Sequence, residues 1–491
     1  MSEPFDLIVI GGGVNGAGIA RDAAGRGGKV LLLEARDLAS GTSSASTKLV
    51  HGGLRYLEYY EFALVREALT EREILWNIAP HVIRPMRFVL PWKPHSRPRW
   101  MLRLGLFLYD HLGRHTKLPG AKGIELRDHP AGRPLDPAIL HGFEYSDGWV
   151  DDARLVVLNA LDAAERGADI RTHTPALAAR REGELWAVET SAGVFHGRGL
   201  VNAGGPGADE VSRLAGQEPR FALRRVRGSH IVTRKLFDHP YAYIFQLPDT
   251  RICFAIPYEG EFTLIGTTDR DHDGSLTHVE ASGDEIAYLC EAASLYFARP
   301  VTPADVVWTY SGVRALVDDG SGRPEAATRG YRLPISEAAE GAPLLEVYGG
   351  KITSYRHLSE AAVDLLAQRI PALSSRPAWT AQSPLPGGDF PEDGQPRLIA
   401  SLSARYPFLS DADAARIARA YGTRAERWLG SAADWGDLGR HFGHGLSEAE
   451  IRYLREEEWA TTAEDVLWRR SKLGLHMSEA ERAAVKAFIG A

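Results

Sequence analysis

Five serine and threonine hydroxyls, a lysine, a histidine and an arginine lie within one short stretch, GTSSASTKLVHGGLRYLE at residues 41–58. Little of this stretch suits a hydrophobic core. Hydroxyls, backbone NH groups and cations are the groups that bind small anions such as phosphate. Because the stretch follows a nucleotide-binding signature, we predict that it forms a loop against a cofactor.

That signature is a G-x-G-x-x-G pattern made by Gly11, Gly13 and Gly16. The first glycine allows a tight turn, the second leaves room for a pyrophosphate, and the third lets a helix pack closely on a strand. The helix N-terminus adds NH groups and the positive end of a dipole. Glu34 stands where an acid can accept hydrogen bonds from ribose hydroxyls, and its charge disfavours a 2′-phosphate. The pattern predicts a dinucleotide site, with a purely structural glycine turn as the alternative.

FAD and NAD share this signature, and the residues that follow it distinguish the two. NAD-binding domains usually continue directly with further βαβ units. Here the chain runs instead into DLASGTSSASTKLVHGG (37–53), which has neither helical nor strand periodicity. Its hydroxyl and NH groups suit a loop wrapped on a pyrophosphate and an isoalloxazine edge, whereas a solvated Ser/Thr loop is the plainer interpretation. Beside the glycine signature, we predict FAD.

A βαβ unit at the start of the chain must position these residues. FDLIVI (5–10) has the length and β-branching of a buried strand, the glycine turn opens a helix within 11–27, and KVLLLE (29–34) is the next strand. Further helices and strands are predicted from apolar spacing and turn signals. The helices cover 61–80 and 151–167, the latter capped by Gly167, the strands cover 184–190 and 199–205, and 344–370 has a strand–glycine–helix pattern.

The residue pattern changes in two later regions. Residues 220–275 cluster β-branched and aromatic residues between turn signals, which predicts an antiparallel sheet inserted into the nucleotide-binding domain. The segment SPLPGGDFPEDGQP (383–396) is rich in proline and glycine and marks a boundary. Residues 397–491 then have a mostly helical pattern.

Composition excludes several classes of protein. The 491 residues carry a formal net charge of −7, which argues against a nucleic-acid partner. The two cysteines, Cys253 and Cys290, show no metal-ligand spacing, so we predict neither a disulfide scaffold nor a metal site. No run of about 18 apolar residues occurs, so we expect no transmembrane helix and only peripheral membrane contact.

Several stretches taken together are far more specific than the glycine signature. The sequence strongly resembles the FAD-dependent, membrane-associated glycerol-3-phosphate dehydrogenases of bacteria over nearly its whole length. The stretches that carry the resemblance are TSSASTKLVHGGLRYLE (42–58), YDHLG (109–113), GFEYSDGWVDDARLV (142–156), RGSHIV (227–232), IGTTD (265–269), WTYSGVRAL (308–316) and YGGKITSYR (348–356).

The resemblance implies a fold and an activity. The expected fold is α/β, with a Rossmann-type FAD-binding domain, an antiparallel-sheet substrate cap as in D-amino-acid oxidases, and a helical C-terminal domain. Residues 1–383 would form the FAD-dependent part, with the cap mainly at about 80–150 and 215–310, and residues 384–491 the C-terminal domain. The expected activity is oxidation of sn-glycerol 3-phosphate to dihydroxyacetone phosphate by hydride transfer to N5 of noncovalent FAD. Electrons would pass to a membrane quinone at the cytoplasmic face of the inner membrane.

The resemblance and the motifs also place the cofactor. The residues expected to contact FAD are Gly11, Gly13, Asn15, Gly16, Glu34, Thr42, Ser43, Ser46, Lys48, Gly53, Gly204, Gly350, Lys351 and Thr353.

A phosphate monoester carries nearly two negative charges, so its site needs clustered cations. The candidates are Arg55, Arg314 and Lys351, each beside glycines in the matched stretches. By resemblance, Arg55 and Arg314 hold the substrate, with Tyr56 and Thr353 nearby. A surface or ion-pairing role is the ordinary alternative for any single arginine.

Hydride transfer from the substrate requires a base for its hydroxyl proton, and histidine suits that role. His51 and His230 are the histidines in the matched stretches, and the sequence does not decide between them. His230 is also a candidate substrate contact. Arg314 and Lys351 complete the predicted catalytic group, and Arg314 can stabilise the developing alkoxide.

The segment 96–117 combines basic and aromatic residues as an amphipathic segment on anionic lipid would, although a buried helix with a charged rim fits equally. Residues 452–470 suit an amphipathic helix pair in domain packing. A homodimer is left open. The sequence departs from the family at Gly148, Gly207 and Ala315, where cysteine, an aromatic residue and proline are usual.

Two other activities compete with the dehydrogenase. A related oxidase would pass electrons to oxygen and form hydrogen peroxide. A non-catalytic flavin-binding sensor would keep the cofactor loops but lose the substrate cations, and Arg55, Arg314 and Lys351 are all present.

Overall fold

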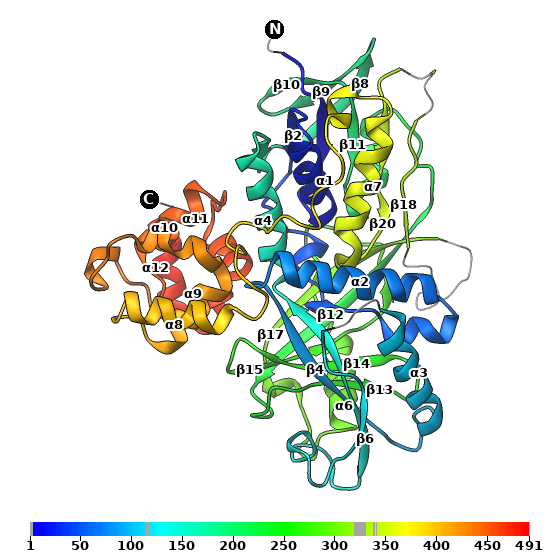
Figure 1. The fold of residues 1–491 in the computed structure, drawn as a ribbon, viewed down its shortest axis with the longest axis vertical. Coiled ribbons are helices and arrows are strands. Elements are labelled where there is room, and N and C mark those ends of the chain that lie inside the picture. Colours follow the sequence, from blue (N-terminus) through cyan, green and yellow to red (C-terminus); the bar gives the residue numbers. More distant parts are fainter. Residues whose placement is uncertain (1–2, 114–116, 319–329, 337–338, 340, 491) are drawn as a thin grey trace.

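The computed structural model describes residues 3–113, 117–318, 330–336, 339 and 341–490. Its N-terminal part is built on a five-stranded parallel sheet with the order β19-β11-β1-β2-β7 (Figure 1). The predicted βαβ unit is confirmed and forms the centre of this sheet. The strands are β1 (Leu7–Ile10), β2 (Val30–Leu33), β7 (Asp169–Arg171), β11 (Leu200–Asn202) and β19 (Leu344–Glu346).

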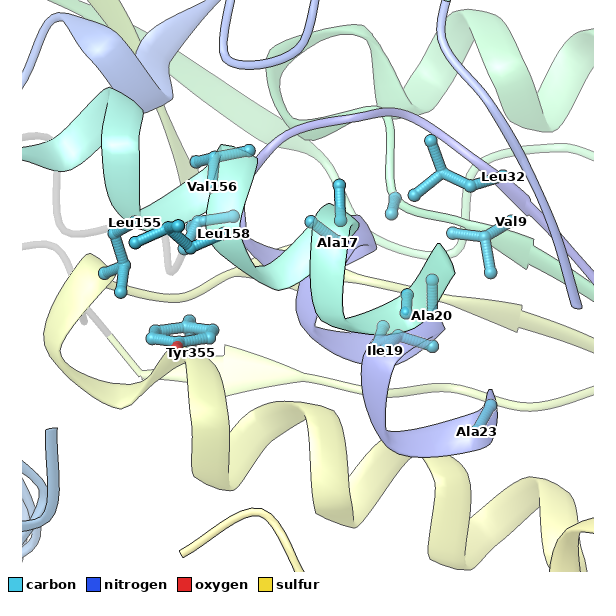
Figure 2. Packing of buried hydrophobic residues seen from close by; sticks show 14 of the residues in the cluster. Val9, Ala17, Ile19, Ala20, Ala23, Leu32, Leu155, Val156, Leu158 and Tyr355 are labelled. Carbon is cyan, nitrogen blue, oxygen red and sulfur yellow. The ribbon is translucent and has the colours of Figure 1, made fainter. Parts of the chain in front are cut away.

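Both faces of the parallel sheet are covered, so its central strands, β1 and β2, are apolar throughout. Leu7 and Val9 of β1 face a helical layer, whereas Ile8 and Ile10 face a small antiparallel sheet. The helices are α1 (Val14–Gly25), α4 (Asp152–Glu165) and α7 (Tyr355–Ala367), and the small sheet contains β8 (Ala176–Glu182), β9 (Leu185–Thr190) and β10 (Gly193–Gly197). Figure 2 shows Val9 and Leu32 of the sheet near Ala17 and Ala20 of α1, in the layer that α4 and Tyr355 complete.

A second, ten-stranded sheet forms the cap. Its main order is β16-β12-β15-β14-β13-β4-β6-β3, with β17 on β12 and β5 on β6, and it is antiparallel except where β13 meets β4. Helix α3 (Arg99–Leu112) packs on one face and α6 (Gly283–Ser294) on the other. The strands are β3 (Leu49–Val50), β4 (Ile83–Pro91), β5 (Lys122–Glu125), β6 (His141–Val150), β12 (Leu223–Arg234), β13 (Ala242–Gln246), β14 (Ile252–Tyr258), β15 (Phe262–Gly266), β16 (Arg270–Asp271) and β17 (Val306–Val317).

The sheet extends beyond the ranges expected for the cap. β3 brings residues 49–50 into it, and β17 continues past residue 310 to Val317. The reason is pairing, because β17 runs antiparallel to β12 along nearly its whole length. Arg314 therefore projects from a cap strand, and Gly312 lies close enough to the 41–58 stretch that an added Cβ would be 2.8 Å from the Ala45 Cβ.

The remaining elements connect or extend these layers. Helix α2 (Phe62–Ile78) corresponds to the helix predicted at 61–80, and Gly167 has the positive φ of a helix cap. The 3-10 turn η2 (Leu54–Tyr59) precedes α2. Helix α5 (Ala208–Leu214) follows β11, and β18 (Tyr331–Arg332) pairs with β20 (Tyr348–Gly349).

The helices after residue 394 form a cluster with a hydrophobic core of its own. Figure 1 shows it beside α4, on the side of the molecule away from α3. The predicted helix pair at 452–470 is a regular helix, α11, followed by a π-helical turn at Asp465–Arg470. The helices are α8 (Gln395–Arg405), α9 (Asp411–Tyr421), α10 (Glu426–Leu429), α11 (Glu448–Glu456) and α12 (Glu479–Ile489).

Two global expectations concern the cysteines and the membrane. Cys253 and Cys290 are both buried with free thiols. Within the part of the chain that the structure describes, no helix has the length and apolar content needed to cross a bilayer.

The close packing of α1 on β1 gives the first prediction. A Cβ on Gly16 would lie 1.8 Å from the Gly11 carbonyl oxygen, so either the turn or the helix must move in Gly16→Ala. We expect a loss of about 1–3 kcal/mol in the free energy of unfolding, measured by chemical denaturation, together with weaker retention of the dinucleotide.

Gly105→Ala is the matched control, because a Cβ at Gly105 in α3 meets nothing within 4 Å. This substitution should stabilise the protein by about 1 kcal/mol through helix propensity. An equal change in the free energy of unfolding in the two variants would contradict the close packing of α1 on β1.

Candidate active site

The glycine turn and the hydroxyl-rich loop meet at the N-terminus of α1. Gly11 has φ +115°, and an added Cβ would lie 2.4 Å from the Ala203 carbonyl oxygen at the end of β11. Ser43 Oγ accepts a hydrogen bond from the Val14 amide at 3.0 Å. The loop that was predicted to wrap on a cofactor therefore lies directly over the NH groups that would bind its phosphates.

Glu34 is held with both carboxylate oxygens oriented. Its Oε2 accepts from the Gly12 amide at 2.6 Å and its Oε1 from the Arg36 amide at 2.8 Å. Burial raises the pKa of Glu34, and these two amides only partly oppose that rise. Each oxygen keeps a lone pair for a neighbouring hydroxyl, as ribose recognition requires.

A second glycine loop lies beside the first. Asn15 Nδ2 donates to the Gly349 carbonyl at 3.4 Å, and a Cβ on Gly350 would lie 3.4 Å from the same amide nitrogen. The Gly204 amide, at the end of β11, donates to Asn202 Oδ1. Residues 11–16, 204 and 349–353 therefore converge, although they are far apart in sequence.

Three of the expected cofactor residues use their side chains to hold the loop. The Lys48 ammonium is buried and lies 2.7 Å from Asp152 Oδ1. Ser46 Oγ donates to Asp152 Oδ2 at 2.7 Å, and Thr42 Oγ1 donates to the Val313 carbonyl. These side chains fix the loop to α4 and β17, so their expected contacts with a cofactor would come from the backbone.

The cations expected to hold the substrate lie around the next turn. Gly53 has φ +77° and begins η2, and Tyr56 packs so closely that a Cβ on Gly53 would lie 2.1 Å from its ring. Lys351 Nζ lies 3.7 Å from the centroid of the Tyr56 ring. Arg55 donates to the Tyr59 hydroxyl at 3.4 Å, while its Nε is buried without a hydrogen-bond partner among the described residues.

The same turn reaches the loop after β20. The His51 amide donates to Thr353 Oγ1 at 3.3 Å, and the His51 ring stands edge-on to Phe254 with centroids 6.4 Å apart. Two of the predicted segments, 51–56 and 351–353, thus form one site.

Arg314 approaches from β17. Its guanidinium forms an ion pair with Asp269 and donates to Thr267 Oγ1 at 3.0 Å. Glycine at position 228 leaves the space, because a Cβ there would lie 2.4 Å from Arg314 Nη2. The guanidinium is therefore oriented by the protein itself.

His230 is buried next to these cations. Its Nε2 lies 2.9 Å from Thr47 Oγ1, and its ring stacks on Tyr310 with centroids 4.7 Å apart. Burial, and then the positive charges of Arg314 and Lys48, hold the pKa of His230 well below its ordinary value. The ring is neutral at pH 7, and within the described residues its Nδ1 is buried without a partner.

Sequence reasoning did not single out four residues that shape this site. Thr47 and Tyr310 fix the His230 ring, Asp269 orients Arg314, and Asp152 anchors the loop. All four lie in the stretches that carried the family resemblance, but their roles depend on partners distant in sequence.

The contacts at Gly12, Glu34 and Asn15 fit a bound dinucleotide. Lys351 and Arg55 lie at the turn beside it and Arg314 lies near His230, an arrangement that fits the class of flavin-dependent oxidoreductases. A family model described as FAD dependent oxidoreductase matches residues 6–356, and one described as the C-terminal domain of alpha-glycerophosphate oxidase matches residues 378–490. The chain belongs to the FAD-dependent oxidoreductases, and its cofactor is FAD. The predicted α/β fold and the family resemblance are confirmed.

Individual relatives are similar over their whole length. The chain is 50% identical over 493 residues to D-erythritol 1-phosphate dehydrogenase from Brucella abortus, covering 99% of this chain and 98% of that protein. It is 48% identical over 494 residues to aerobic glycerol-3-phosphate dehydrogenase from Escherichia coli, covering 99% and 97%. The structure of glycerol-3-phosphate dehydrogenase from Bacillus halodurans complexed with FAD matches with a TM-score of 0.76 at 25% identity, covering 100% of this chain and 94% of that one.

The departures from the family pattern differ in how tightly they are packed. A Cβ on Gly207 would come no closer than 3.8 Å to the neighbouring atoms, so the backbone here has room for the Cβ of the usual aromatic residue. A Cβ on Gly148 would lie 2.8 Å from the Val50 carbonyl oxygen, so this position in β6 favours glycine in the present packing. For Ala315 the structure offers no account.

The depressed pKa of His230 predicts a pH dependence of stability. Below about pH 6.5, the ordinary pKa of histidine, the unfolded chain binds a proton that the native state excludes. The stabilisation that the native state gains from keeping His230 neutral is therefore fully present above that pH, and it is lost as the pH falls. Removing the ring in His230→Asn should therefore reduce the fall in the free energy of unfolding below pH 6 by about 1.4 kcal/mol per pH unit.

Chemical denaturation at pH 7, 6 and 5 measures these slopes. His278→Asn, at an exposed histidine, is the control and should keep the wild-type slope. Parallel slopes for wild type and His230→Asn would show that the buried ring takes up a proton as readily as in the unfolded chain.

Proposed function

We propose that this protein oxidises sn-glycerol 3-phosphate to dihydroxyacetone phosphate. The observation that carries the proposal is that the turn bearing His51 and Arg55 contacts the loop bearing Lys351 and Thr353, next to the glycine turn. Besides burial, which is the larger cause, the charge of nearby Arg314 lowers the pKa of the His230 ring. The names of relatives at about half identity over full length support it. Noncovalently bound FAD, held by the glycine loops and Glu34, would supply the acceptor for the hydride from C2.

The residues of the chain bind and orient the substrate. Arg55 and Lys351 offer positive charge to the phosphate, and Tyr56 and Thr353 border that position. Arg314 is already oriented by Asp269 and Thr267, so it stabilises alkoxide charge without reorganisation. The hydroxyl proton passes to a neutral histidine, His230 or His51, as the carbonyl forms.

A second candidate substrate is D-erythritol 1-phosphate, which is favoured by the relative at 50% identity. This compound is also a polyol monophosphate with a secondary alcohol, and it is one hydroxylated carbon longer. The same cations would bind its phosphate, so the reaction class is unchanged and only the substrate length differs.

Anaerobic titration of the holoenzyme tests the function. Glycerol 3-phosphate should bleach the oxidised flavin absorbance stoichiometrically, whereas unphosphorylated glycerol should not, because the cations have no phosphate to bind. Faster reduction by D-erythritol 1-phosphate at equal concentration would assign the longer substrate. A flavin that neither phosphate reduces would overturn the proposal and favour a sensor.

Arg314→Ala serves as the matched variant in this titration. It should slow flavin reduction and raise the substrate concentration required, by roughly a hundredfold in kcat/KM, yet retain FAD. Loss of the flavin from this variant would instead assign Arg314 to the cofactor.

The electron acceptor that we propose is a membrane quinone. The related oxidase remains a distinct outcome, because the model matched by residues 378–490 is named after one. Oxygen consumption with peroxide formation, in the absence of any quinone or dye, would assign the oxidase activity.

We further propose peripheral attachment to the cytoplasmic face of the inner membrane through α3 and the turn before α2. Tyr60 is 80% exposed, Trp100 67%, Phe107 53% and Leu104 51%, and η2 contacts α3. Arg99 and Arg103 accompany these apolar side chains, while Arg114 lies outside the described residues. Large exposed apolar side chains among cations suit an anionic bilayer surface.

Two further proposals concern organisation. Residues 384–491 would form a C-terminal domain separate from 1–383, in keeping with the core shared by α8–α12. A homodimer stays open as a prediction.

Vesicles containing phosphatidylglycerol test the lipid surface. The double substitution Trp100→Gln and Phe107→Gln should weaken vesicle binding by roughly tenfold or more, since two large apolar side chains no longer enter the interface. Cosedimentation measures the binding.

Leu177→Gln, at an exposed leucine of β8 in the small sheet, is the control and should bind as wild type does. Unchanged binding of the double variant would place the membrane surface elsewhere.

A further inference from the structure

The helical C-terminal cluster contacts the loop that carries the ribose-binding acid. Asp37 lies three positions after Glu34 and is buried. Its Oδ1 and Oδ2 accept from both terminal nitrogens of Arg470 at 2.8 and 2.7 Å, and Oδ2 also accepts from Arg469 Nε at 2.6 Å. Both arginines belong to the π-helical turn at Asp465–Arg470.

The residues after Asp37 are also held by the core, because Leu38 and Ala39 are buried in it. The Ala39 amide donates to the Gly12 carbonyl, which ties the loop back to the glycine turn. Immediately beyond, Ser40 and Gly41 line a cleft of about 660 Å³ together with Trp468 and Lys486. The arginines at Asp37 therefore hold the loop just before the buried residues Leu38 and Ala39.

Arg470 also connects to a later part of the same loop, at Ser46 and Lys48. Arg470 donates to the Glu458 carbonyl at 2.6 Å, and the Glu458 carboxylate forms a buried bidentate pair with Arg154 of α4. Two residues earlier in α4, Asp152 binds Lys48 and Ser46 of the hydroxyl-rich loop. One continuous network thus joins the C-terminal cluster to two points of the 37–53 loop at the FAD site, Asp37 and Ser46–Lys48.

A third contact reaches the same region through Thr461, whose hydroxyl and amide also bind Asp465, the partner of Arg469. Thr461 Oγ1 lies 2.8 Å from His173 Nε2, and the His173 amide donates to the Arg36 carbonyl at 2.8 Å. The next amide, that of Thr174, donates to the Glu34 carbonyl. The backbone on both sides of the acid is therefore linked to the C-terminal cluster.

We propose that the C-terminal cluster completes the FAD site, with Asp37, Arg470 and Glu458 as positioning residues that hold the 37–53 loop in its binding conformation at two points, Asp37 and Ser46–Lys48. None of these residues needs to touch FAD. The cluster thereby acts as a brace, and detaching it would lower FAD affinity before it altered the chemistry of the loaded enzyme.

The ionisation of the brace favours this role. Burial opposes charge on Arg154 and Arg469, yet Glu458 and Asp37, respectively, raise the pKa of each arginine above its ordinary value. Removing one partner of a buried pair leaves an uncompensated charge, which disrupts far more than the loss of a surface pair. Docking of the C-terminal cluster therefore favours the loop conformation that binds FAD. By thermodynamic linkage, FAD binding must favour docking of the cluster by the same free energy.

The test is the FAD dissociation constant of apoprotein reloaded with cofactor, measured by flavin fluorescence. Asp37→Asn and Arg470→Met should each raise the FAD dissociation constant roughly tenfold. The double variant should raise this constant by much less than the product of the two single increases, because both substitutions break the same ion pair. At saturating FAD, kcat and KM for glycerol 3-phosphate should stay within about twofold of wild type. The inference rests on FAD binding alone, so a wrong substrate assignment would leave it intact.

Arg416→Met is the matched control, because Arg416 forms a buried bidentate pair with Glu450 inside the C-terminal cluster and does not contact the 37–53 loop. It should lower stability without changing the FAD dissociation constant. Should Asp37→Asn and Arg470→Met fail to fold, Thr461→Val removes only the hydroxyl contacts with His173 and Asp465 and should still raise the constant about threefold. Wild-type constants in the brace variants, or an equal rise in Arg416→Met, would overturn the proposal.

Discussion

The buried ion pair between Lys48 and Asp152 is the interaction on which the site depends. The stretch 41–58 contains only short turns and a two-residue strand, so no extended hydrogen-bond ladder fixes its shape. Asp152 accepts from Lys48 Nζ, Ser46 Oγ and the Ser46 amide, and it stands at the start of a helix that is buried along most of its length. The loop is therefore anchored to α4, and this anchor sets where the following residues, from His51 to Tyr56, begin.

Polar groups in this protein act in chains more than in isolated pairs. Asp152 secures the loop and Arg154, in the same helix, secures the C-terminal cluster. On the other side, Thr47 fixes the ring of His230, whose neutrality follows from burial beside Arg314 and Lys48. In the proposed site, Arg55 and Lys351 would bind the phosphate, whereas burial and then the charges of Arg314 and Lys48 keep His230 neutral. Positive charge in this region therefore favours both a bound anion and an uncharged histidine ring.

Prediction from the sequence succeeded where local chemistry decides structure. The glycine signature, the acid at Glu34 and the helix at 151–167 depend on steric and hydrogen-bonding preferences that act over a few residues, and all have the expected local form. Alternating cap strands were also predictable from their period. The extent of β17 was not, because its last residues are held by pairing with β12, a partner far away in sequence.

The sequence by itself determined the dinucleotide-binding unit, the family and the types of residue at the site, because these depend on short-range patterns and motif spacing. Only the tertiary structure decided which groups are committed to other partners. Lys48 is paired with Asp152 and Arg314 with Asp269, and the folded chain alone reveals these pairings, since charge pairing acts through space between residues that no local pattern connects. For the same reason, the attachment of the C-terminal cluster at Asp37 appears only when residues 37 and 470 are brought together.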